Sequence, residues 1–150
     1  MTAYFFDASA LVKRYLREVG SEWVRHLIAH EQPRIFVSSL SGPDVLAAIM
    51  RKGRTGEASP PERDRAVKAF RSEFTTSYAL IPPERTVIQK AMDLLLTYPL
   101  RAYDAVQVAS ALTLPPPPQG VKLTFVSADE GLLTVTKKLG CPIENPNLHP

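Results

Sequence analysis

The sequence predicts a three-layer α/β fold, in which a central, mostly parallel β-sheet is flanked by helices. Two observations lead to this prediction. Short apolar segments rich in β-branched and aromatic residues alternate with longer segments of helical periodicity, which is the order of β-α-β units. The apolar segments also lack the strict apolar–polar alternation of a half-exposed sheet, so both of their faces should be buried, as in parallel sheets.

The strand-like segments are short and mostly apolar. They read AYFF, RIFV, YALI and KLTFV, at residues 3–6, 34–37, 78–81 and 122–126. The tail, CPIENPNLHP, is expected to add a short edge strand and a loose end. The four prolines at 115–118 predict a rigid, extended connector into the strand at 122, not a domain boundary.

Helical patterns fill the segments between these strands. Trp23 and Leu27 are four residues apart and share one face of such a helix. Gly20 and Gly53 are expected to stop the helices that precede them, and proline pairs open two segments in a manner suited to a first helical turn. The expected helical segments are 9–18, 21–30, 43–52, 60–74, 82–98, 103–112 and 129–140.

Composition indicates a single globular domain spanning residues 1–150. The hydrophobic fraction is 45% and the charged fraction 22%, as in ordinary globular proteins. No apolar run approaches the ~18 residues of a membrane span, and the N-terminus lacks the pattern of a secretory signal. The single cysteine, Cys141, fits a reducing compartment. We therefore expect a cytoplasmic protein with no membrane partner.

The positive charge is concentrated in one segment. The net charge of the chain is +3. The segment from Arg51 to Arg71 contains seven basic and three acidic residues, so it carries +4 and the rest of the chain about −1. Such a segment can be a phosphate-facing surface, or it can be the solvated face of an amphipathic helix. The sequence leaves both interpretations open.

Four aspartates stand at the ends of predicted elements. Asp7 directly follows the strand at 3–6, and Asp129 comes just after the strand at 122–126. Asp44 lies in the first turn of the helix after the second strand, and Asp104 begins a helix that is otherwise apolar and small. Because ligands of open α/β sheets bind outside the carboxyl ends of the strands, these acids should meet at one edge.

Each of these acids has a structural alternative, because aspartate is favoured at helix N-termini by capping and by the helix dipole. Together, however, four carboxylates in a partly buried cleft would repel one another unless a hard divalent cation such as Mg²⁺ or Mn²⁺ were bound. The three histidines are scattered and suggest no zinc site. We therefore expect the four carboxylates to converge within a few ångströms of a shared cation position.

The order of these motifs resembles a known family. YFFDASALVKRY, VSSLSGPDVLAAIMRK, LRAYDAVQVASAL and FVSADEGLLTVTKKLG are similar to the four acidic motifs of the PIN domain. Within that family the closest likeness is to the VapC-type toxins of bacterial toxin–antitoxin pairs and their stand-alone relatives, from about residue 3 to 145. One position departs from the pattern: Asp44 stands where the family usually has a glutamate, which is one methylene longer.

The resemblance implies a metal-dependent endoribonuclease that hydrolyses phosphodiester bonds of RNA. It assigns Asp7, Asp104 and Asp129, with Asp44 as a fourth contributor, to one or two Mg²⁺ or Mn²⁺ ions. Beside these acids stand two serines with short hydroxyls, which could orient a carboxylate or a metal-bound water, or could simply cap helices; they are Ser9 and Ser127.

Basic residues near the acids are candidates for RNA phosphate contacts. They are Lys13, Arg14, Arg51, Lys52 and Arg101. Arg101, three residues before Asp104, could equally pair with an acid and hold the cluster together.

The resemblance also implies a homodimer and an antitoxin partner whose C-terminal segment lies across the active-site groove. The apolar pairs Leu11/Tyr15 and Trp23/Leu27 could line such an interface, although core packing explains them more simply.

Three other functions remain alternatives. The short Asp44 side chain could leave a PIN-like module that binds RNA or protein without cutting. An aspartate-based phosphoryl-transfer enzyme is disfavoured, because the second acid that the phosphatase pattern needs is replaced by Ser9. A purely structural domain would require four unrelated helix caps.

Overall fold

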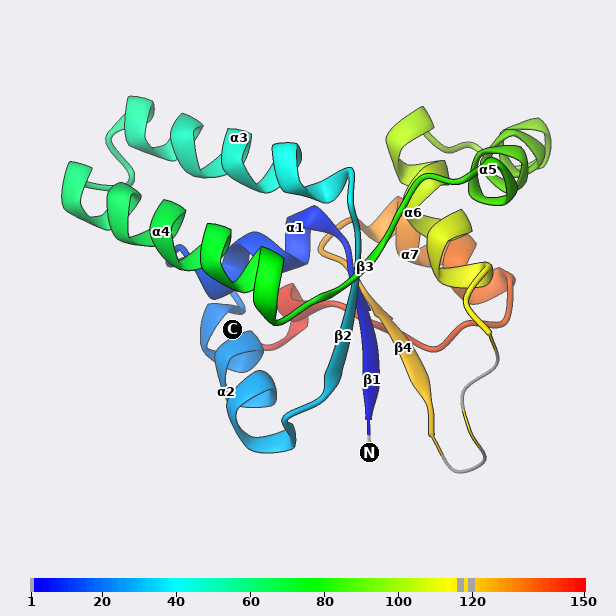
Figure 1. Cartoon of the computed structure of the whole chain (residues 1–150), viewed down its shortest axis with the longest axis horizontal. Coiled ribbons are helices and arrows are strands. Elements are labelled where there is room, and N and C mark those ends of the chain that lie inside the picture. The colour runs from blue at the N-terminus through cyan, green and yellow to red at the C-terminus, as the bar shows by residue number, and fades with distance from the viewer. Residues whose placement is uncertain (1, 116–117, 119–120) are drawn as a thin grey trace.

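The protein contains a parallel sheet between two layers of helices (Figure 1). The computed structural model describes residues 2–115, 118 and 121–150. Among these residues five strands form one sheet in the order β3-β2-β1-β4-β5, and every neighbouring pair is parallel. The strands are β1 Ala3–Phe6, β2 Arg34–Ser38, β3 Ala79–Ile81, β4 Leu123–Val126 and β5 Ile143–Glu144. The predicted fold class and the short edge strand in the tail are thus confirmed.

Helices follow the strands in the predicted order. The α-helices are α1 Ala8–Leu11, α2 Ser21–Glu31, α3 Ser41–Thr55, α4 Pro60–Thr76, α5 Arg85–Thr97, α6 Ala102–Leu112 and α7 Glu130–Lys138. Two short 3-10 helices are η1 Val12–Arg14 and η2 Pro146–Leu148. In Figure 1, α1 to α4 lie on one side of the sheet and α5 to α7 on the other. The extended connector predicted at 115–118 includes residues 116 and 117, which lie outside the described residues.

Adjacent residues of the central strand supply the two hydrophobic cores. Phe6 packs with α1, α2, α3 and α4, while Phe5 packs with α5, α6 and α7. Both side chains are fully buried, and the Phe5 ring stacks on Phe125 of β4 with 5.1 Å between centroids. Successive side chains of a strand point to opposite faces, so burial on both faces explains the unbroken apolar run of β1.

Two predicted helix ends are wrong. The helix after β1 ends with η1 at Arg14 instead of continuing to residue 18. The helix of Asp44 passes through Gly53 and stops at Gly56, which has the left-handed φ of 81°. A Cβ on Gly53 would lie 2.8 Å from Cδ of Arg63, so this glycine allows α4 to pack closely.

The two proline pairs behave differently. Pro60 lies in the first turn of α4, behind a capping box formed by Ser59 and Glu62, as predicted. The second pair precedes α5, which begins only at Arg85. A proline pair therefore located the start of one helix but not of the other.

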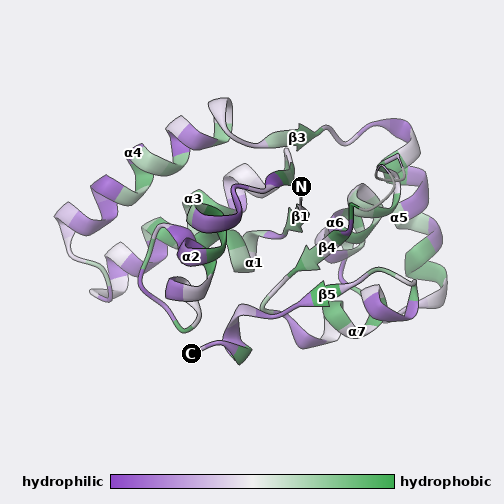
Figure 2. Cartoon of the chain, turned by 90° about the horizontal axis from the view of Figure 1, so that it is seen from below, coloured by the Kyte–Doolittle hydropathy of each residue, from purple (hydrophilic) through white to green (hydrophobic). Residues whose placement is uncertain are grey.

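The central strands and helix α4 differ in hydropathy. In Figure 2 the strands at the centre are hydrophobic, whereas α4 is largely hydrophilic along its outer turns. Among the residues that the structure describes, no helix combines the length and apolarity needed to cross a membrane.

Candidate active site

Asp7 is built into the carboxyl end of β1. It forms the N-cap of α1, where its Oδ1 accepts a hydrogen bond from the backbone N–H of Ala10 at 3.1 Å. Oδ1 also accepts from Ser9 Oγ at 2.7 Å, and Oδ2 accepts from Ser127 Oγ at 2.7 Å. The residue is only 5% exposed. Three donors thus hold one buried carboxylate in a fixed orientation.

Burial raises the pKa of Asp7 to about 6, and the charge of Asp104 adds to that rise. Hydrogen bonds from Ser127, Ser9 and Ala10 act in the opposite direction, because they favour the ionised carboxylate. The net rise shows that burial outweighs the three hydrogen bonds.

The two serines also join the ends of the two central strands. Ser9 Oγ accepts from the backbone N–H of Ala128 at 3.0 Å, and Ser127 Oγ accepts from the backbone N–H of Asp129 at 3.0 Å. Each hydroxyl therefore links the Asp7 carboxylate to the loop between β4 and α7. Carboxylate orientation and helix capping were the two alternatives for these serines, and both hydroxyls contact the Asp7 carboxylate.

Arg101 bridges two of the other acids. Its Nε donates to Asp104 Oδ2 at 3.1 Å, and its Nη2 donates to Asp129 Oδ2 at 3.3 Å. Asp129 also caps α7 by accepting from the backbone N–H of Leu132 at 3.1 Å. Asp129 therefore caps a helix and also shares the Arg101 guanidinium with Asp104. The Arg101 side chain is 81% exposed, so it rests on these carboxylates from the solvent side.

Asp44 and Asp104 face a common cleft of about 840 Å³ between α3, α1 and the start of α6. Partial burial raises the pKa of Asp44, and the nearby charge of Asp104 raises it further. Ser9 and Arg101 line the same cleft. The carboxyl ends of the strands therefore bring residues from all four motifs into one neighbourhood.

The four side chains do not meet around one point. Within the described residues, no group of three or more His, Cys, Asp or Glu side chains is placed closely enough to hold a metal ion. The acids have different partners: the two serines and the Ala10 amide donate to Asp7, whereas Arg101 pairs with Asp104 and Asp129. The expected convergence within a few ångströms of one cation position is not met in this conformation.

The predicted phosphate contacts divide into distinct groups. Arg51 and Lys52 line the acidic cleft, as does Arg101. Lys52 Nζ pairs with Glu18 at 3.0 Å, so its charge is partly neutralised. Arg51 is exposed on α3.

Lys13 and Arg14 are less accessible to a substrate in the cleft. Lys13 is buried, and its Nζ donates to Val19 O at 2.8 Å and to Glu18 Oε1 at 3.2 Å. Arg14 turns away from the cleft and forms a two-pronged ion pair with Glu73 of α4, with an Nη2–Oε2 distance of 2.8 Å.

Two residues of the cleft wall were missed by sequence reasoning. Glu18 forms ion pairs with both Lys13 and Lys52 and so connects η1 with α3. Tyr103, directly before Asp104, lines the cleft and is half exposed. Its position within the third motif was the available signal, whereas nothing in the sequence pointed to Glu18.

The apolar pairs considered as interface walls belong mainly to the core. Leu11 and Leu27 are buried, and Tyr15 and Trp23 pack against the same cluster from partly buried positions. This confirms the simpler interpretation.

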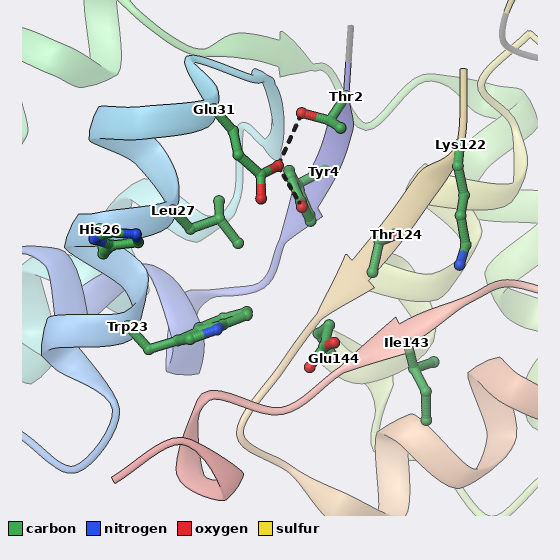
Figure 3. A pocket seen from close by; sticks show the side chains of 10 residues that line it. All are labelled: Thr2, Tyr4, Trp23, His26, Leu27, Glu31, Lys122, Thr124, Ile143 and Glu144. Atoms are coloured by element: carbon green, nitrogen blue, oxygen red, sulfur yellow. Dashed lines mark hydrogen bonds between the residues drawn. The ribbon is translucent and has the colours of Figure 1, made fainter. Parts of the chain in front are cut away.

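A separate hollow of about 370 Å³ lies between α2 and the β4–β5 edge (Figure 3). Glu31 Oε2 accepts there from Tyr4 at 2.8 Å and from Thr2 at 3.1 Å. Trp23 and Glu144 also line it, but none of the four aspartates does. This hollow is therefore distinct from the acidic cleft.

Comparison with known sequences identifies the family. A family model described as the PIN domain matches residues 4–138. Ribonuclease VapC46 of Mycobacterium tuberculosis is 29% identical over 148 residues, which cover 98% of this chain and all of that protein. Ribonuclease VapC45 of the same species is 30% identical over 150 residues, with complete coverage of both chains.

Solved structures with low sequence identity share the fold. VapC20 of Mycobacterium tuberculosis, described as a sarcin–ricin-loop cleaving toxin, has a TM-score of 0.66 at 14% identity and covers 88% of this chain and 94% of its own. A toxin–antitoxin complex from Klebsiella pneumoniae has a TM-score of 0.61 at 14% identity, with coverage of 95% and 97%. The chain belongs to the PIN-domain family, and within it to the VapC-type ribonucleases.

Proposed function

We propose that this protein is a Mg²⁺- or Mn²⁺-dependent endoribonuclease that hydrolyses RNA phosphodiester bonds. The observation that supports the proposal lies at the carboxyl end of the sheet, where Asp44 and Asp104 line one open cleft. Ser9 of the cleft wall donates a hydrogen bond to Asp7, and Arg101 joins Asp129 to Asp104. The kinship with ribonucleases VapC supplies the reaction class.

The residues at the cleft fit a hard divalent cation. Their donor atoms are carboxylate oxygens, which suit Mg²⁺ and Mn²⁺. The pKa values of Asp7 and Asp44 are both raised, first by burial and then by the charge of Asp104, which indicates that added positive charge would stabilise the ionised acids. Asp7, Asp104 and Asp129 would hold the ion, with Asp44 as the fourth contributor.

When bound, the metal would polarise the phosphodiester and lower the pKa of a coordinated water. The protein's own groups prepare this site. Ser9 and Ser127 fix the orientation of the Asp7 carboxylate, and Arg101 would release Asp104 and Asp129 to the ion. Arg51 and the released Arg101 would then face the phosphates of an RNA chain.

We further infer that the protein acts in the cytoplasm as the toxin of a toxin–antitoxin pair and forms a homodimer. The Klebsiella pneumoniae neighbour is a toxin–antitoxin complex, and VapBC2 of Rickettsia felis shares the fold with a TM-score of 0.60 at 11% identity, over 95% of this chain and 98% of its own. An antitoxin segment laid across the cleft would block access to the acids.

Cleavage of a mixed RNA pool tests the enzymatic proposal. Purified protein is incubated with Mg²⁺ or Mn²⁺, and separately with chelator, beside an Asp7→Asn variant. Metal-dependent cutting by the wild type, absent from the variant, is expected. Cutting that persists in chelator would contradict the proposal.

The alternative function is a PIN-like module that binds RNA or a protein partner without turnover. The observation that favours it is Asp44, whose carboxylate is one methylene shorter than that of the glutamate usual in the family. If the folded wild type does not cut RNA, an Asp44→Glu variant tests the cause. Cutting by that variant would show that the short Asp44 side chain is the reason for the lack of activity.

A further inference from the structure

A second concave surface lies beside the acidic cleft, and the two surfaces adjoin at η1. Val12 and Lys13 line the cleft, whereas Arg14, the following residue, lines a hollow of about 450 Å³. Arg25 of α2 and a face of α4 complete the wall of this hollow. The 3-10 helix η1 therefore separates two surfaces that are adjacent along the chain.

The acids of this hollow are already engaged. Glu73 accepts three hydrogen bonds from Arg14: two from Nε, at 3.1 and 3.0 Å, and one from Nη2 at 2.8 Å. Glu62 belongs to the capping box of α4, where it accepts from the backbone N–H of Ser59 at 3.2 Å. Glu62 keeps its negative charge: the hydrogen bonds with Ser59 and the charges of Arg65 and Arg17 lower its pKa. Two glutamates therefore face four arginines around the hollow, which leaves a net charge of +2.

Three more arginines line the hollow: Arg17, Arg25 and Arg65. All are exposed, and within the described part of the chain none of them forms an ion pair with a carboxylate at 4.0 Å or less. Arg25 Nε donates to Arg14 O at 3.2 Å, which anchors this side chain at the rim. The hollow thus carries excess positive charge, which comes from α2, from α4 and from the segment between η1 and α2.

We propose that Arg17, Arg25 and Arg65 bind the sugar–phosphate backbone of the RNA substrate on the far side of η1 from the acids. The inference builds on the proposed ribonuclease function and extends it to a substrate-binding track. A guanidinium presents a planar fork of donors that matches phosphate oxygens, and several such groups along a groove follow a backbone.

The lining also indicates phosphate contact and not base recognition. Ala66 and Ala69 of α4 are small, so they leave room for a backbone between the arginines. The one aromatic side chain in the wall, Tyr15, is occupied by a hydrogen bond to Tyr78 and an edge contact with Phe70. We therefore expect affinity without sequence preference from this surface.

The test compares two triple variants that lose the same charge. The hollow variant carries Arg17→Gln, Arg25→Gln and Arg65→Gln. The control carries three substitutions at exposed bases that line neither surface: Lys68→Gln, Arg71→Gln and Lys90→Gln. Binding of a fluorescent single-stranded RNA of roughly 20 nucleotides is followed by anisotropy in chelator, so that no turnover occurs.

The hollow variant should bind about tenfold more weakly at low salt, and the slope of log K against log salt should fall by about 2, because roughly 0.7 counterions are released per phosphate contact. The control should change by less than about threefold, through long-range charge alone. Equal losses in the two variants, or no loss in either, would overturn the inference.

Cleavage assays separate this inference from the proposed function. With Mn²⁺, the hollow variant should keep the wild-type rate on an RNA of about four nucleotides, too short to span both surfaces, and show a raised KM on long RNA.

A wild type that binds RNA through the hollow but cuts none would refute the nuclease and leave the RNA track standing. Normal cutting of long RNA by the hollow variant would refute the track and leave the nuclease standing. Selective loss of polyglutamate binding, with RNA binding intact, would assign the hollow to an acidic protein and overturn the RNA inference.

Discussion

Asp7 and Asp44 belong to the same acidic neighbourhood, yet the fold supports them very differently. Asp7 is buried at the end of β1 and accepts three hydrogen bonds from two strand ends and a helix. Asp44 is half-buried on α3 and, among the described residues, has no hydrogen-bond or ion-pair partner. The strand-end half of the site is thus preorganised, whereas the α3 half is positioned only by its helix. We expect substitutions in the first half to have the larger effects.

The largest effect is expected from Asp7→Asn. Loss of this charge removes a carboxylate whose orientation the fold fixes, and cleavage should fall about 10³-fold or more. The fold should persist, because the asparagine oxygen can still accept from Ala10. Single-turnover cleavage with Mn²⁺ measures the loss, and circular dichroism checks folding. A fall of less than about tenfold would remove Asp7 from the centre of the site.

A stability difference of about 2 to 3 kcal/mol is expected from the titration of Asp7 in metal-free protein. Its folded pKa of about 6 lies above the ordinary value of 3.8, so the folded state binds the proton more tightly than the unfolded state. This contribution to the free energy of unfolding is therefore fully present below pH ~4 and is lost as the pH rises through about 6.

Urea denaturation in chelator at a series of pH values measures this dependence. The Asp7→Asn variant is the control, because it lacks the titrating group, and it should become more stable relative to the wild type as the pH rises. A constant difference between the two proteins from pH 4 to 8 would show that the Asp7 carboxylate is not destabilised by burial.

Substitution of Asp44 should have an intermediate effect on RNA cleavage, and it tests the difference between Asp7 and Asp44 most directly. Asp44→Asn should lower cleavage by about tenfold, because this acid is an additional contributor on a less constrained element. Asp44→Glu extends the carboxylate by one methylene and should raise Mn²⁺ affinity. Calorimetric titration with Mn²⁺ and single-turnover rates test both. A loss for Asp44→Asn as large as that for Asp7→Asn would remove the proposed difference between the two halves.

The smallest effect is expected from Arg101→Gln. Its guanidinium bridges Asp104 and Asp129 from an exposed position, and exposed ion pairs are weak, so it should compete only mildly with a metal. The variant should bind Mn²⁺ a few-fold more tightly in calorimetry and cleave RNA more slowly, because a phosphate contact is lost. Weaker Mn²⁺ binding would show that Arg101 organises the acids instead of competing for them.

Local sequence patterns were sufficient for the sheet and for the positions of the acids. The apolar runs at β1 and β4 and the aspartates behind them placed Asp7 and Asp129 at the carboxyl edge. Helix ends were less predictable, because Gly53 serves close packing against Arg63 instead of a helix stop. Residues such as Glu18 were missed because their role depends on partners far away in the sequence, here Lys52.

The sequence by itself thus determined the parallel α/β architecture and the four acidic element ends, because hydrophobic periodicity and strand termination are local properties of the chain. Only the tertiary structure decided which partner each acid has. Ser127 reaches Asp7 across 120 residues, and Arg101 reaches Asp129 across 28. Packing also turned the neighbours Lys13 and Arg14 toward different surfaces. Such pairings depend on how β1, β4 and α4 pack together, and no local pattern encodes that packing.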